Sequence, residues 1–233
     1  MKITHFIPDP KSSFQLPPVT AKSMIPQWYK DGETTYFSDN KTNKGLKTCV
    51  PFLDGFLTGY LLLTSVNIYV SKNLDGTISV NYDDELEAER MPVVERPKEA
   101  GSTMPRPAGH IPNHLVWTSN WGWKTPKGYS TLVTHPLNRF DLPFTTMSAI
   151  VDSDKFYGPG NIPFFLKEDF EGIIPKGTPF VQLIPIKRKK WISVYSPFKI
   201  EDSLKNGDEG ADGEYKRKFW QKKDYSIGEK NGK

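Results

Sequence analysis

Residues 126–187 read PKGYSTLVTHPLNRFDLPFTTMSAIVDSDKFYGPGNIPFFLKEDFEGIIPKGTPFVQLIPIK, and this stretch decides the fold class. Short runs of β-branched, aromatic and aliphatic residues alternate in it with Pro, Gly, Asn and Asp, which favour turns. The pattern predicts strands within 128–136, 145–154, 161–167, 171–175 and 178–188. Several short strands separated by turns are typical of an all-β barrel, sandwich or jelly roll.

A tryptophan-rich segment precedes this stretch. Residues 115–126, LVWTSNWGWKTP, predict one more strand region, in which Trp117, Trp121 and Trp123 alternate with other residues. A period of two places side chains on one face of a strand. We therefore expect the three indoles to pack in the core or against a second subunit, rather than to stack on bases.

The first half of the core has weaker signals. Residues 61–70 predict a strand, and Asp75-Gly76 predicts a hairpin turn that leads into a second strand. A short helical turn is expected at 54–58. We thus expect a mainly β chain with few helices.

Composition divides the chain into three parts. Residues 1–48 are rich in Pro, Lys and Asn, and we expect an N-terminal arm packed on the domain. Residues 49–200 are expected to form a single β-rich domain, with 83–109 as a surface excursion. The polar, basic tail 201–233 is expected to hold one short helix within 212–223, anchored by Phe219 and Trp220.

Length and composition exclude several classes of protein. A chain of 233 residues with 13% aromatics can bury a core without covalent staples. Its one cysteine, Cys49, excludes an intramolecular disulfide and a zinc site built on cysteines. The longest apolar run, 56–70, is too short and too polar to span a bilayer. We therefore expect a cytoplasmic protein without a membrane partner (in the host cytoplasm, if a phage encodes it).

The net charge of +4 is mild, and the cations gather in 187–190 and 216–223. Runs of this kind are usually solvated surface. Contact with nucleic acid is the second interpretation and is not favoured by the sequence.

Polar residues at strand ends and turns supply the candidate site. An aspartate can order a water molecule or Mg²⁺, an arginine can neutralise phosphate, and an amide can orient a ligand. Asp152 is the catalytic candidate, and the ligand-binding candidates are Asn138, Arg139, Asp141, Asp154, Lys176 and Gln182. Structural roles remain the alternative, in which the acids cap turns, Arg139 pairs with one of them and Gln182 satisfies a strand edge.

Part of this stretch resembles the trimeric dUTPase and dCTP deaminase superfamily, which has the β-clip fold. The similar elements, in chain order, are 149–152 (AIVD), Tyr157-Gly158 with Ile162, 176–177 (KG) and 182–183 (QL). The resemblance implies a dUTPase-like β-clip or a related distorted barrel or jelly roll. Two elements of the superfamily differ here: Asn138-Arg139-Phe140 replaces its R-S-G element, and its glycine-rich C-terminal arm is missing after residue 201.

The resemblance also implies roles and partners. Asp152 would correspond to the acid that orders the attacking water, Gln182 would contact the phosphate or the neighbourhood of the base, and Arg139 would neutralise phosphate. It implies a nucleotide or another small phosphorylated ligand, with Mg²⁺ as a candidate cofactor, and a homotrimer. The chain from 49 to 191 further resembles a family of tailed-phage and bacterial proteins through 124–130, 136–139, 151–154 and 176–185.

Two other functions remain open at this point. One is a non-enzymatic protein that sequesters a ligand or serves structure and interaction, which fits the missing arm and the Pro-rich N-terminal segment. The other is a metal-dependent oxygenase on a jelly roll, which would use His110, His114 or His135 with Asp141 or Asp152. The histidines lack the spacing of a ligand motif, and their ordinary role is hydrogen bonding inside the fold.

Overall fold

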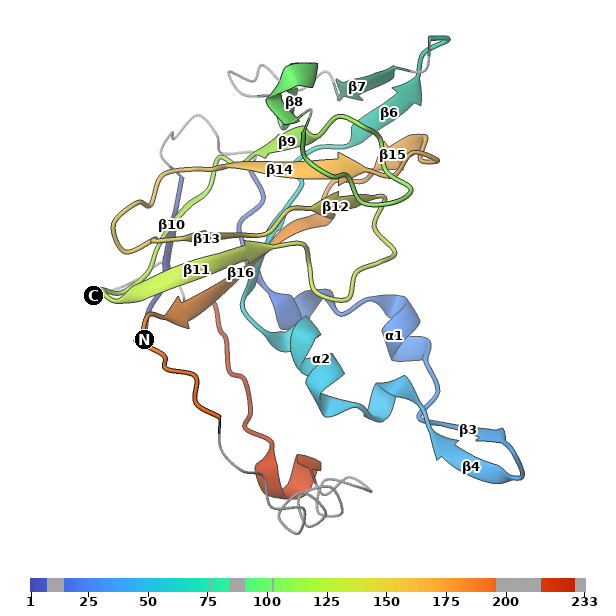
Figure 1. Cartoon of the computed structure of the whole chain (residues 1–233), viewed down its shortest axis with the longest axis vertical. Helices are drawn as coiled ribbons and strands as arrows, with labels where there is room; N and C mark the ends of the chain where they lie inside the picture. Colours follow the sequence, from blue (N-terminus) through green and yellow to red (C-terminus); the bar gives the residue numbers. More distant parts are fainter. Residues whose placement is uncertain (8–14, 76, 84–90, 102, 196–214, 229–233) are drawn as a thin grey trace.

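The computed structural model describes residues 1–7, 15–75, 77–83, 91–101, 103–195 and 215–228. Antiparallel strands dominate this part of the chain, which confirms the expected mainly β class (Figure 1). The largest sheet has five strands in the order β13-β11-β16-β5-β2. Their bounds are Ala149–Val151, Tyr129–Thr134, Pro179–Lys187, Tyr60–Leu63 and Val19–Thr20.

The remaining strands form smaller sheets. A four-stranded sheet has the order β12-β14-β9-β8, with bounds Phe144–Thr146, Asn161–Leu166, Leu115–Thr118 and Val93–Glu95. A three-stranded sheet has the order β15-β6-β7, with bounds Gly172–Ile174, Ile68–Lys72 and Ile78–Tyr82. Two pairs, β1-β10 and β3-β4, have bounds Thr4–Phe6, Gly122–Lys124, Thr35–Ser38 and Lys41–Lys44. None of these sheets closes into a barrel within the described ranges.

The helices are short, as the density of Pro and Gly leads us to expect. Helix α1 spans Gln27–Asp31 and α2 spans Val50–Leu57, and Figure 1 places both beside the β3-β4 hairpin. Helix α2 is longer than the turn expected at 54–58, because Pro51 sits in its first turn, where a missing amide proton costs nothing. Single helical turns are η2 (Ala21–Met24), η3 (Leu46–Thr48), η4 (Lys98–Gly101) and η6 (Tyr215–Phe219). In the described residues, no helix is long and apolar enough to cross a membrane.

Aromatic side chains build the centre of the core. Trp117 is buried and stacks on Phe164, with 3.9 Å between ring centroids, and it meets Phe144 edge-on at 4.9 Å. Its indole nitrogen donates to Thr146 Oγ1 at 3.2 Å, so the one polar atom of the ring is satisfied. Burying each such ring contributes about 1.5–3 kcal/mol, which explains how a chain with few aliphatic residues forms a core.

The strands predicted within 128–188 are all present, and two predicted regions split into pairs. Residues 61–70 give β5 and β6, and the region at 145–154 overlaps β12 and contains β13. The hairpin expected at Asp75-Gly76 joins β6 and β7, although Gly76 itself lies outside the described residues. The short C-terminal helix is the turn η6.

One sequence expectation needs correction. The tryptophans do not share one strand face, because the chain turns between β9 and β10, where Ser119 Oγ and the backbone of Trp121 exchange hydrogen bonds at 3.0 and 3.1 Å. Trp117 and Trp123 nevertheless belong to the core, and Trp121 packs against it. The segments 1–48 and 83–109 contribute strands to the sheets, because β2 pairs with β5, β1 with β10, and β8 with β9.

Candidate functional site

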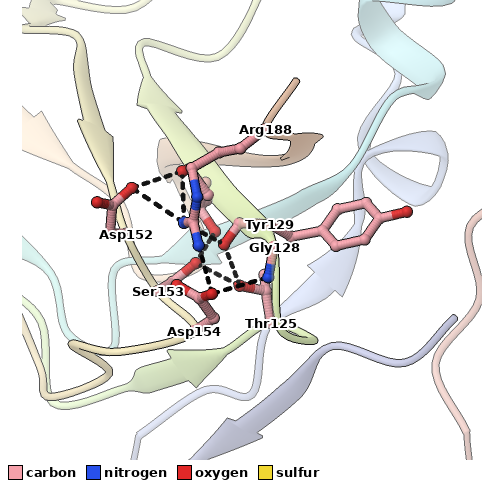
Figure 2. A network of polar contacts seen from close by, with 9 residues as sticks. Thr125, Gly128, Tyr129, Asp152, Ser153, Asp154 and Arg188 are labelled. Carbon is pink, nitrogen blue, oxygen red and sulfur yellow. Dashed lines mark hydrogen bonds and ion pairs between the residues drawn. The ribbon is translucent and has the colours of Figure 1, made fainter. Parts of the chain in front are cut away.

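The densest polar network lies where β13 ends beside the start of β11. The Arg188 guanidinium donates through Nη1 to Asp152 Oδ1 at 3.0 Å and through Nη2 to Asp154 Oδ2. Nη1 also donates to the carbonyl oxygen of Tyr129 and to Ser130 Oγ, both at 3.0 Å. Figure 2 shows the guanidinium between the two carboxylates. One arginine therefore fixes both acids of the VDSD segment.

Strand pairing puts these groups together. In the register of β11 with β13, Thr131 faces Val151, so Asp152, the first residue after β13, reaches Ser130. Ser130 Oγ donates to Asp152 Oδ1 at 2.7 Å. Between the two acids, the buried Ser153 hydroxyl contacts Thr125 Oγ1 at 2.8 Å and Thr131 Oγ1 at 2.7 Å. Because Ser153 points into the fold, its two acidic neighbours are directed toward Arg188.

The turn before β11 supplies one more donor. The backbone N–H of Gly128 donates to Asp154 Oδ2 at 2.8 Å, and the N–H of Arg188 donates to the carbonyl oxygen of Gly128 at 2.8 Å. A positive φ of 83° at Gly128 shapes this turn and suits glycine. The turn at 125–128, the end of β13 and the first residue after β16 thus form one rigid unit.

Both carboxylates are held in their charged form. Hydrogen bonds from Arg188 and from the Gly128 amide lower the pKa of Asp154 to about 2. The Ser130 hydroxyl and the charge of Arg188 lower the pKa of Asp152. The same acids, Asp154 first, raise the pKa of Arg188. At neutral pH the network therefore carries two negative charges and one positive charge.

The two acids differ in access to solvent. The Asp154 side chain is only 4% exposed, whereas that of Asp152 is 58% exposed. Both hydrogen bonds to Asp152 end on Oδ1, which leaves Oδ2 open among the described contacts. Asp152 thus presents a fixed, ionised oxygen to solvent, and such an oxygen can bind a cation or orient a water molecule.

Three lysines are neighbours in sequence of residues in this network. Lys127 precedes Gly128 in its turn, Lys155 follows Asp154, and Lys187 precedes Arg188; all three are exposed. Within the described part of the chain, no ion pair involves these three side chains. Carboxylates and ammonium groups are the two kinds of group that bind a phosphorylated ligand with its metal ion, and this part of the chain supplies both.

Gln182 lies in a different place. It faces Thr134 across the β11-β16 ladder, four residues along β11 from Ser130, which is roughly 13 Å at the usual rise of a strand. Its side chain is buried and accepts from the Leu137 amide at 2.7 Å. It also donates to the carbonyl oxygens of Gly55 at 3.0 Å and Thr58 at 2.5 Å. All three partners are backbone groups of this chain, so the Gln182 side chain holds parts of the fold together.

Asn138, Arg139 and Asp141 form a second polar cluster beside α2. Arg139 donates to Asp141 through Nε at 2.9 Å and through Nη2 at 2.8 Å, a bidentate pair. Burial acts to raise the pKa of Asp141, but the Arg139 hydrogen bonds and charge outweigh it, so this pKa is lowered. Asn138, at a positive φ of 61°, donates to the carbonyl oxygen of Phe52 at 3.2 Å. The cluster thus ties the 136–142 loop to α2.

Lys176 occupies a third place. Its backbone N–H donates to Asn67 Oδ1 at 2.9 Å in the turn before β16. The structure therefore brings Asp152 and Asp154 together, and Asn138, Arg139 and Asp141 together, but not these two groups with each other or with Lys176. Arg188, Ser130 and Ser153 complete the first group and were not among the site residues predicted from the sequence.

The histidines considered for a metal are not gathered at one point. Both ring nitrogens of His110 are engaged, with the Ala108 carbonyl and Thr145 Oγ1, each at 2.9 Å. His135 contacts the Arg139 carbonyl at 3.0 Å and the Thr146 amide at 3.2 Å, and His114 packs edge-on against Phe165. Over the described ranges, no group of three His, Cys, Asp or Glu is placed to hold a metal ion. The geometry that an iron oxygenase would need is not found there.

Comparisons with known proteins give structural likeness only. No protein-family model matches the sequence, and no curated protein matches it. Similar solved structures include a mutant dUTPase from phage phi11 of S. aureus, described with a structural Mg(II) ion, at 10% identity, a TM-score of 0.37, and coverage of 85% of this chain and 99% of that one. Another is a mutant dUTPase of Staphylococcus bacteriophage 80alpha, at 10% identity, a TM-score of 0.35, and coverage of 85% and 98%.

A second mutant of the 80alpha dUTPase, determined with dUpNHpp, matches at 10% identity and a TM-score of 0.34, with coverage of 86% of this chain and 93% of that one. Similarity at this level assigns neither a family nor an activity to the chain.

Proposed function

We propose that the chain binds a small phosphorylated ligand, with a nucleotide as the first class to test, at the Asp152 end of β13. The observation that carries the proposal is the Asp152 carboxylate. It is fixed by Ser130 and Arg188, ionised, and open to solvent through its second oxygen. The motif resemblance within 126–187 supports a nucleotide rather than another phosphate ester.

The acidic and the basic residues would have different roles in binding. Asp152 Oδ2 would hold Mg²⁺ or order a water molecule, while Lys127 and Lys155 would contact phosphate oxygens. Mg²⁺ is commonly bound through one or two carboxylates together with the phosphates of its ligand, so a single open carboxylate fits a metal that arrives with the ligand. Arg188 is a positioning residue, because both of its terminal nitrogens already donate to Asp152, Asp154 or the β11 backbone.

Hydrolysis is a separate step from binding. The carboxylate of Asp152 can orient a water molecule, but its lowered pKa makes it a weak base. The homotrimer implied by the motif resemblance stays a prediction, which light scattering of the purified chain would test.

A thermal-shift screen with a panel of nucleoside mono-, di- and triphosphates, with and without Mg²⁺, tests the proposal. A ligand at a hundred times its Kd stabilises a protein by about 2.7 kcal/mol, which such a screen detects. The shift should vanish in Asp152→Asn, which keeps an oxygen for Ser130 and Arg188. The matched control is Asp169→Asn, at an exposed aspartate in the turn before β15, and it should keep the shift.

Two results would refute the proposal: no nucleotide gives a shift, or Asp152→Asn binds as well as the wild type. Lys127→Ala with Lys155→Ala should weaken binding without abolishing it, since each removes one phosphate contact. Any nucleotide that binds should then be incubated with the protein and its products separated, which shows whether binding leads to hydrolysis.

A further inference from the structure

The segment that leaves β16 exposes large side chains to solvent. Residues 189–195, KKWISVY, are all exposed, and the Trp191 side chain is 84% exposed. Figure 1 shows this part of the chain running away from the sheets after β16. Hydrophobic and aromatic residues grouped on a surface indicate a binding site, because a solitary domain gains nothing from leaving them in water.

Cations are interleaved with these aromatic residues. Lys187, Lys189 and Lys190 lie within the four residues before Trp191, and all three are exposed. Among the described residues, the adjoining network holds two carboxylates, Asp152 and Asp154, and both pair with Arg188. Positive charge therefore dominates the surface on which Trp191 begins.

A second exposed aromatic lies in the adjoining turn. Phe156 is 64% exposed, and its backbone N–H donates to the Asp152 carbonyl oxygen at 2.9 Å. Arg188 joins this turn to the end of β16 through its bonds to Asp152 and Asp154. Trp191 follows Arg188 by three residues and Phe156 follows Asp154 by two, so both aromatic residues are near neighbours in sequence of the network in Figure 2.

This combination fits one class of partner better than others. Ammonium groups attract a phosphate backbone, and exposed aromatic rings stack on bases of any identity. A duplex hides the faces of its bases, whereas a single strand presents them. An apolar protein surface would match Trp191 and Ile192 but would give the three lysines no partner.

We propose that the exposed segment with Lys187, Lys189, Lys190, Trp191 and Tyr195, together with Phe156 of the adjoining turn, binds single-stranded nucleic acid. The lysines contact successive phosphates, and Trp191 stacks on a base. The inference does not depend on the proposed nucleotide site, because it does not use the open oxygen of Asp152.

Fluorescence anisotropy of the full chain with a labelled oligothymidylate tests this inference. The affinity should fall with salt, with a slope of about −0.7 in log K against log salt for each phosphate contacted. Lys189→Ala with Lys190→Ala should therefore make the slope shallower by about 1.4. Trp191→Ser should weaken binding about tenfold, since it removes one stacked base. A duplex of the same length should bind more weakly than the single strand.

The β3-β4 hairpin provides a matched control. Phe37 is 72% exposed there and Lys41 is exposed. Phe37→Ser with Lys41→Ala therefore removes an exposed aromatic ring and an ammonium group from a different part of the surface. This control should bind the oligonucleotide like the wild type. Circular dichroism should show the same fold in every variant.

Several results would overturn the inference. One is the absence of binding at low salt, and another is equal binding by the wild type and Trp191→Ser. A third is a wild-type oligomer that Trp191→Ser converts to a monomer with unchanged oligonucleotide affinity, because the segment would then dock on a second copy of the chain. Asp152→Asn should keep oligonucleotide binding and Trp191→Ser should keep any nucleotide shift, so either proposal can fail alone.

Discussion

The indole N–H of Trp220 donates to both carboxylate oxygens of Asp54, at 3.1 and 3.0 Å, across 166 residues of chain. Lys223 Nζ lies 2.8 Å from Asp54 Oδ2, so α2 holds the C-terminal segment through one acid. Tyr225 adds an edge-on contact with Tyr60 of β5, at 5.7 Å between ring centroids. The tail after η6 is therefore an integral part of the domain.

Removing this indole should destabilise the protein. Trp220→Ala takes away the hydrogen bonds of a largely buried carboxylate, and we expect the free energy of unfolding to fall by about 1.5–3 kcal/mol. Phe219→Ala, at the preceding and more exposed aromatic, should change it by less than about 0.5 kcal/mol. Urea denaturation of both variants measures the difference, and equal losses would contradict the role of Trp220.

Gln182 should matter for stability through its buried amide. Gln182→Leu leaves the Leu137 amide and the carbonyl oxygens of Gly55 and Thr58 without their partner. Each unsatisfied buried group costs about 1–3 kcal/mol, so we expect a loss of about 3 kcal/mol or more in urea denaturation. Gln27→Leu, on the exposed face of α1, is the control and should have little effect. A small loss at Gln182 would show that the loop and α2 do not need this link.

Gly59 should tolerate no side chain. It has a φ of 77°, and a Cβ there would lie 2.2 Å from the Leu183 carbonyl oxygen. Gly109 has a similar φ of 72° but open space around it. Gly109→Ala should therefore cost only the backbone strain, about 1 kcal/mol, whereas Gly59→Ala should cost clearly more, because β16 must also move. Equal melting temperatures for the two variants would contradict this packing.

The Asp154–Arg188 pair should make stability depend on acid pH. The pKa of Asp154 is about 2 in the folded state, below its ordinary value of 3.8, so folding favours the ionised form. The resulting stability is present above pH 4 and is lost as the pH falls toward 2. Urea denaturation between pH 5 and 2 should show wild type losing its advantage over Asp154→Asn across this window. Parallel curves for the two proteins would contradict the assignment.

Local signals were enough to predict the strands of the second half of the chain. Alternating β-branched and aromatic residues, bounded by Pro and Gly, carry their own boundaries, as in β11, β14 and β16. The short strands β2 and β8 were missed because each has only two or three residues. They form because β2 pairs with β5 and β8 pairs with β9. A local sequence pattern contains no information about a pairing partner that is distant in the chain.

The candidate site was predicted in part for the same reason. The sequence singled out Asp152 and Asp154 from their place after a strand, and the structure joins them. It missed Arg188, because a run of four cations is typical of solvated surface. The position of Arg188 after a predicted strand is the signal that could have identified it. Arg188 directly follows β16, and because both β16 and β13 pair with β11, it lies at the same end of the sheet as the end of β13. Arg139 pairs with Asp141, as the structural alternative had it. The partners of Gln182 are backbone groups of distant segments, and no spacing in the sequence indicates them.

The link between Asp54 and Trp220 has a consequence for synthesis in the cell. Ribosomes add about 5–20 residues per second, so the 166 residues between these partners take roughly 10–30 s to make. During that interval Asp54 has neither Trp220 nor Lys223 to neutralise and cover it. The nascent chain must therefore keep the Asp54 carboxylate hydrated until the segment that carries Trp220 and Lys223 has been made.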